Sequence, residues 1–138
     1  MSYKSLEHAT DAIFEVTAPS LEEAFVVAAK SVIETILDTN TIEETQEKSL
    51  VVSGKDLRYL LYNWLEEIII LTITDGFAAK TITVKVEKND EYKISTVLKG
   101  EKINIKKHHF KVEIKAPTFH DMEIKQDGTV YMRYLLDL

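Results

Sequence analysis

The sequence predicts a single α+β domain, in which two main helices pack on a mostly antiparallel sheet. Two observations support this class. Apolar residues at helical spacing fall in the first half of the chain, whereas alternating, strand-like patterns fill the second half. The chain also has 138 residues without an internal repeat or linker, so we expect residues 1–138 to form one domain.

The first half begins with a predicted strand and helix. Residues 12–16 form an apolar, strand-like run, and a helix is expected to follow Pro19. Ser20 and Glu23 have the spacing of a capping box, in which each side chain bonds a free backbone N–H of the first helical turn. The helix should bury one face and fade near residues 38–40, since its apolar residues recur at helical spacing: Leu21, Phe25, Ala28, Val32 and Ile36.

A strand, a second helix and a hairpin are expected next. The strand includes Leu50 to Val52 and ends at Gly54, and Asp56 can cap a helix whose apolar stripe includes Trp64. Trp64 and Phe25 are predicted to lie in the core. The end of this helix stays open, because β-branched residues follow it. Residues 81–87 and 92–99 then read as the two strands of a hairpin.

The C-terminal part is predicted to consist of strands. Residues 110–116 alternate apolar and charged side chains, which is typical of a half-buried strand. Pro117 cannot donate a ladder hydrogen bond, so it indicates a sheet edge or a bulge. Residues 118–125 and 130–138 form the last two expected strands, separated by a turn at a glycine.

Composition and motifs narrow the function. The net charge of −6 and the pI of about 5.2 argue against autonomous nucleic-acid binding. The sequence has no cysteine, no glycine-rich phosphate loop and no hydrolase or zinc-protease motif, so support for an enzyme is weak. The first residues lack the apolar core of a signal peptide, and the longest apolar run, residues 68–71, is far too short for a bilayer. We therefore expect a cytoplasmic protein without a membrane partner.

Acidic residues stand at both ends of the chain. The segment Glu7-His8-Ala9-Thr10-Asp11 precedes the first predicted strand, and Asp137 stands one residue before Leu138. Taken separately, Asp11 and Asp137 are ordinary acids on a solvated segment and an exposed strand face. If the first and last strands are neighbours, however, both carboxylates and the terminal carboxylate would crowd together, which calls for a hard cation or a bound proton.

Such a cluster would favour particular metals. Carboxylate oxygens suit calcium, magnesium or manganese rather than zinc. Two side chains and a terminus are too few for a calcium shell of roughly six to eight oxygens, so water or a partner would have to complete it. His8 would be a nearby polar partner of such a site.

Four further polar residues stand in the charged C-terminal half: Glu101, His108, Lys115 and His120. Each is unremarkable alone, because exposed histidines are usually solvated and a surface ion pair contributes little. Glu101, Lys115 and His120 could instead converge on the edge that carries Asp137, where His120 would titrate near physiological pH. Both interpretations stay open at this point.

Together these segments resemble the archease family. The resemblance rests on Gly100-Glu101, Lys107-His108, residues 113–120 (EIKAPTFH), the opening segment 7–11 and the helix segment 56–65. It covers nearly the whole chain in the right order. Thr and Ala are exchanged in the opening segment, and Pro117 and Phe119 replace a usual valine and tyrosine.

The resemblance implies an accessory protein, not an enzyme. Archeases assist the tRNA-splicing ligase RtcB, which seals RNA ends with GTP and manganese; they promote guanylylation of the ligase, sustain its turnover and broaden its nucleotide use. The family's metal site carries over to Asp11, Asp137 and the carboxyl end at Leu138, with calcium, manganese or magnesium as the divalent cation. Candidate partner contacts are Glu7, His8, Glu101, His108, Lys115 and His120.

Two other functions compete with this one. The same acids could serve a metal-dependent hydrolase with His120 as its base, or the protein could be a general chaperone-like modulator of RNA-modifying enzymes. A modulator with several partners would need an exposed apolar patch, and the sequence shows no obvious one. An activator, unlike a hydrolase, should be inert toward RNA and nucleotides on its own.

Overall fold

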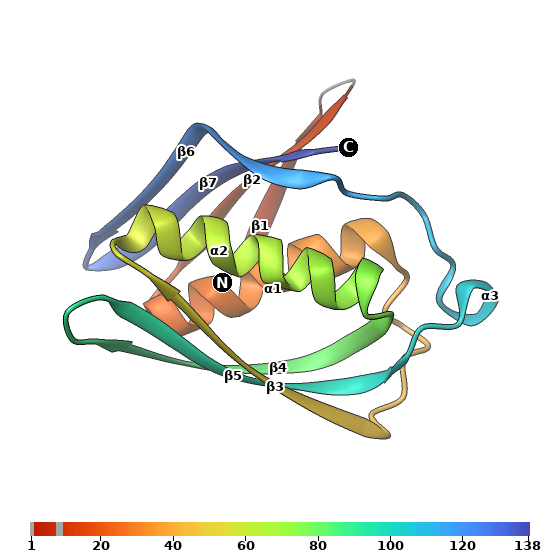
Figure 1. The fold of residues 1–138 in the computed structure, drawn as a ribbon. Coiled ribbons are helices and arrows are strands. Elements are labelled where there is room, and N and C mark those ends of the chain that lie inside the picture. Colours follow the sequence, from red (N-terminus) through yellow and green to blue (C-terminus); the bar gives the residue numbers. More distant parts are fainter. Residues whose placement is uncertain (1, 8–9) are drawn as a thin grey trace.

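The computed structural model describes residues 2–7 and 10–138, and in it two antiparallel sheets enclose a pair of helices (Figure 1). The predicted α+β class is therefore confirmed, with the strands divided between two sheets. The four-stranded sheet has the order β1 (Ser2–Glu7), β2 (Asp11–Ala18), β7 (Thr129–Asp137) and β6 (Ala116–Asp127). The first and last parts of the chain thus meet in its centre.

The second sheet has three strands. Their order is β3 (Gln46–Gly54), β5 (Tyr92–Lys102) and β4 (Phe77–Lys88). β4 and β5 form the predicted hairpin, and the backbone N–H of Asn89 closes its turn on the carbonyl of Glu91 at 3.0 Å. This sheet covers the side of the helices opposite the four-stranded sheet (Figure 1).

Both main helices begin at the predicted caps. The Ser20 hydroxyl accepts a hydrogen bond from the N–H of Glu23 at 3.2 Å and starts α1 (Leu21–Ile36). The Asp56 carboxylate accepts from the N–H of Tyr59 at 2.9 Å and starts α2 (Leu57–Ile69). A π-helical turn, Ile70–Thr74, continues α2 into the β-branched run that left its end open in the sequence.

The core lies between the sheets, around the two helices. Phe25 of α1 and Trp64 of α2 are fully buried, as predicted, and their rings meet edge to face with centroids 6.3 Å apart. The indole N–H of Trp64 donates to the carbonyl of Phe25 at 2.9 Å, so its polar atom is satisfied inside the core.

The predicted strand over residues 110–116 is wrong except for Ala116, where β6 begins. A short helix, α3 (Ile105–His108), precedes this segment, and residues 109–115 then run outside any strand. The N–H of Lys111 donates to the carbonyl of Ile36 at 2.7 Å, at the C-terminal end of α1. Ile114 is buried, as the alternation predicts, but Phe110 is exposed, and the segment packs without a neighbouring strand.

β1 and β6 form the two edges of the four-stranded sheet. β1 was not predicted, because its residues lack a clear alternating pattern. β6 is an edge strand of the four-stranded sheet, which agrees with the prediction from Pro117. Among the helices of residues 2–7 and 10–138, none has the length and apolar character needed to cross a membrane.

Candidate functional site

The acidic ends of the chain meet at one edge of the four-stranded sheet. β2 and β7 are antiparallel neighbours, and their register places Asp11 directly opposite Asp137. β6 begins beside them, with Ala116 opposite Asp137. Main-chain hydrogen bonds fix this arrangement, because the N–H of Lys115 donates to the carbonyl of Asp137 at 2.8 Å and the N–H of Leu138 donates to the carbonyl of Thr10 at 3.2 Å.

Both acids lie on the outer face of this sheet. The alternate residues of β2 and β7, such as Phe14 and Tyr134, are buried against the helices, so Asp11 and Asp137 take the opposite face. Directly opposed residues in an antiparallel pair have Cβ atoms about 4.5–5.5 Å apart, and like charges in that position destabilise the pair. We call Asp11 and Asp137 the acid pair.

The chemistry of the acid pair fits a hard divalent cation, because both side chains offer only oxygen ligands. Among the side chains that the structure describes, however, no three acidic or histidine groups converge in a way that would hold a metal. A cation at the acid pair would therefore need further oxygens from main-chain groups, water or a partner. His8 lies outside the described residues, and Glu7 is described only by its backbone, which pairs with Ala12 at the end of β1.

Glu101 and His108 belong to a different place, a partly buried polar network beside the three-stranded sheet. The Nδ1 atom of His108 accepts from the N–H of Asn104 at 2.9 Å, so its Nε2 carries the proton that points at Glu101, 3.0 Å away. Lys107 adds an ion pair to Glu101 at 2.9 Å, and the N–H of Glu43 donates to the same carboxylate at 2.8 Å. His108 is fully buried.

These contacts strongly favour the charged form of Glu101. The hydrogen bond from the backbone of Glu43, followed by those from Lys107 and His108, lowers the pKa of the Glu101 carboxyl from 4.5 to about 2. Sequence reasoning named Glu101 and His108 but missed Asn104, whose N–H holds the His108 ring. Nothing in the sequence signalled this contact, because it comes from the backbone N–H of Asn104 and the helix that follows is a single turn.

Lys115 and His120 lie at two separate points of the same segment. Lys115 is exposed and adjoins the acid pair through its main-chain bond to Asp137. His120 stands in an irregular part of β6, where the pairing with β7 is interrupted between Thr118 and Glu123. Its ring is exposed, and the Nε2 atom lies 3.3 Å from a carboxylate oxygen of Asp121. Lys115 is thus hydrogen-bonded to the acid pair through its backbone, whereas Glu101 and His108 lie in the separate polar network.

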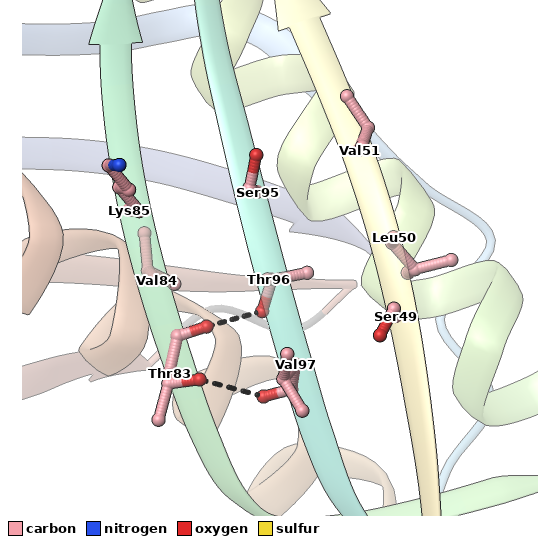
Figure 2. A pocket seen from close by; sticks show the side chains of 9 residues that line it. All are labelled: Ser49, Leu50, Val51, Thr83, Val84, Lys85, Ser95, Thr96 and Val97. Atoms are coloured by element: carbon pink, nitrogen blue, oxygen red, sulfur yellow. Dashed lines mark hydrogen bonds between the residues drawn. The ribbon is translucent and has the colours of Figure 1, made fainter.

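A shallow hollow of about 400 Å³ lies over the three-stranded sheet and is lined by residues 49–51, 83–85 and 95–97. Figure 2 shows mainly short serine, threonine and valine side chains there, with Lys85 at one side. The hydroxyls of Thr83 and Thr96 donate to carbonyls of the neighbouring strand, at 3.3 and 2.8 Å. This lining contains neither acids nor histidines, so the acid pair is the stronger candidate site.

Comparison with known proteins gives a consistent result. The model of the archease protein family (MTH1598/TM1083) matches residues 3–138. Protein archease of Methanopyrus kandleri is 36% identical over 140 residues and is covered completely, as is this chain. Protein archease of Pyrococcus abyssi is 36% identical over 125 residues, or 90% of this chain and 88% of that one. The solution structure of Methanobacterium thermoautotrophicum protein 1598 matches with a TM-score of 0.86 and 32% identity over 99% of each chain.

Proposed function

Because this chain belongs to the archease family, we propose that it is an accessory protein of the tRNA-splicing ligase RtcB. In this role it promotes guanylylation of the ligase, sustains its turnover and alters the nucleotides that the ligase accepts. The observation that carries the proposal is the match to the family over residues 3–138, which includes every segment that resembles the family in sequence.

We further propose that the acid pair, with the carboxyl group of Leu138, holds a divalent cation. Its support is the register of β2 and β7, which opposes Asp11 and Asp137 at the outer face of the sheet. Calcium fits the oxygen-only ligands, and manganese or magnesium would bind in the working complex. A cation there would supply charge neutralisation at nucleotide phosphates. Asp11 and Asp137 would keep it oriented toward the ligase.

The position of the acid pair suits delivery to a partner. Asp137 is exposed, and the described side chains leave the coordination of a cation incomplete. The missing ligands would come from water and from the mouth of the ligase's active site. This corner would therefore help to place metal or nucleotide for attack by the ligase's histidine.

The test is ligase guanylylation at limiting metal, measured with wild-type protein, Asp137→Ala and Asp11→Ala. We expect wild type to stimulate guanylylation and each variant to lose most of that stimulation at saturating concentration. Asp90→Ala is the matched control, because it removes one exposed aspartate from the β4–β5 turn, in the other sheet. Full stimulation by the Asp11→Ala, Asp137→Ala double variant would refute the role of the acid pair.

A parallel reaction separates this proposal from the hydrolase alternative. Purified protein incubated with GTP or RNA, without ligase, should leave both unchanged. Turnover that disappears in His120→Ala would instead favour a hydrolase. The described contact of His120 is with Asp121 and not with the acid pair. This geometry therefore does not support the hydrolase alternative.

A further inference from the structure

The turn around α3 exposes two large apolar side chains at one end of the molecule (Figure 1). We call residues 104–110 the α3 turn. Ile105 is 70% exposed and Phe110 is 38% exposed. Single exposed apolar residues are common on protein surfaces. Here two of the five large apolar side chains exposed among the described residues stand on one short turn.

The backbone of the α3 turn is fixed by its own side chains. The Asn104 side-chain oxygen accepts from the N–H groups of Lys106 and Lys107, both at 3.1 Å, and caps the helix. The N–H of Phe110 donates to the carbonyl of Ile105 at 3.3 Å and closes the turn. The two exposed apolar residues therefore hold a set position relative to each other.

The partly buried polar network of Glu101, Lys107 and His108 anchors this turn to the rest of the protein. Glu101 bonds Lys107 and His108 from the end of β5, and the carbonyls of both residues accept hydrogen bonds at 2.8 Å, from the Thr41 hydroxyl and from the N–H of Asp38. The network points inward while Ile105 points outward. A surface fixed in this way loses less conformational entropy on binding than a flexible loop does.

Lysines flank the apolar residues of the α3 turn, although the whole chain carries a net charge of −6. Lys102 and Lys106 are exposed next to the apolar residues in the chain. Glu101 and the exposed Glu43 are already paired with Lys107, at 2.9 and 3.1 Å. A complementary surface would therefore combine an apolar socket with an acidic rim.

We propose that the α3 turn is a docking element for a protein partner with such a socket. The inference rests on the proposed function, because we take this partner to be the ligase. Residues 109–115 run from the α3 turn to Lys115, whose N–H bonds Asp137, and seven residues reach at most about 25 Å. One partner can thus contact both the α3 turn and the acid pair. Glu101 and His108 act as positioning residues for the turn.

The test separates affinity from activation. The double variant Ile105→Ser, Phe110→Ser should bind purified ligase at least about tenfold more weakly, as expected for a central apolar anchor. In a titration of guanylylation it should need at least about tenfold more protein for half-maximal stimulation, yet reach the wild-type plateau. Val51→Ser is the matched control, because Val51 of β3 is 65% exposed and lies outside the α3 turn. It should change neither the affinity for the ligase nor the concentration for half-maximal stimulation.

Each outcome decides a different point. Unchanged binding by the double variant, or an equal loss with Val51→Ser, overturns the docking element while leaving the proposed function intact. Wild-type protein that binds but does not stimulate overturns the proposed function alone. If the double variant binds RNA more weakly than wild type but binds the ligase equally well, the α3 turn is an RNA contact and the proposal is wrong.

Discussion

At the scale of single residues, the acids of this protein take different roles according to their surroundings. Asp11 and Asp137 oppose each other on an outer sheet face, whereas Glu101 is enclosed by hydrogen-bond donors. The sequence motif made Glu101 a candidate partner contact. The structure instead gives it three described donors within the protein, which is the arrangement of a residue that stabilises local structure.

The low pKa of Glu101 predicts a specific dependence of stability on pH. A carboxyl with a pKa of about 2 in the folded protein and 4.5 in the unfolded chain stabilises the fold above pH 4.5, and this contribution is lost as the pH falls toward 2. Glu101→Gln should therefore be less stable than wild type at pH 7, and the difference should shrink by pH 2.5. Urea unfolding at both pH values measures this.

Glu91→Gln is the control for that measurement. Glu91 is exposed in the β4–β5 turn, so its replacement should leave the stability nearly unchanged at both pH values. A constant difference between Glu101→Gln and wild type across the pH range would contradict the argument from the pKa.

At the scale of elements, local signals were readable in the sequence and pairing was not. The caps at Ser20 and Asp56 were predicted because a cap bonds a backbone group three residues away. The strand at residues 110–116 was wrong because alternation reports burial on one side, and not the presence of a neighbouring strand. The four-residue α3 was missed, since a single turn is too short to show a helical period.

Gly100 makes a prediction at this scale. A Cβ atom added to Gly100 would lie 1.8 Å from the carbonyl oxygen of Ala78 in β4, so β4 and β5 can approach here only without a side chain. Gly100→Ala should lower the free energy of unfolding by about 2–3 kcal/mol. Ser95→Ala, in the same strand, should change it by less than about 0.5 kcal/mol. Equal effects in denaturant titrations would contradict the steric account.

At the scale of the whole molecule, the sequence predicted the fold class but not how the strands divide. Antiparallel patterning was clear, yet nothing local tells a strand which sheet it joins. The acid pair was foreseen only conditionally, because it depends on β2 and β7 being neighbours across almost the full length of the chain. The resemblance to the family, and not the periodicity, suggested that Asp11 and Asp137 form one site.

The shared core predicts that both sheets unfold together. Leu98 of β5 and Met132 of β7 are fully buried on opposite sides of the helices. Leu98→Ala and Met132→Ala should each cost about 2–5 kcal/mol and shift one common transition, seen alike by far-UV circular dichroism and by the fluorescence of Trp64, the single tryptophan. Separate transitions for the two probes would show that the sheets unfold independently.

The order of strands in the four-stranded sheet also sets the order of events during synthesis. β2 leaves the ribosome early, but its partner β7 is made only after β3, α2, β4, β5 and β6. Until then β2 lacks one of its two neighbours, and contacts so distant in sequence form slowly. The acid pair therefore forms only after β7 has been synthesised. A chain that terminates before β7 lacks the acid pair, which we expect to face the ligase.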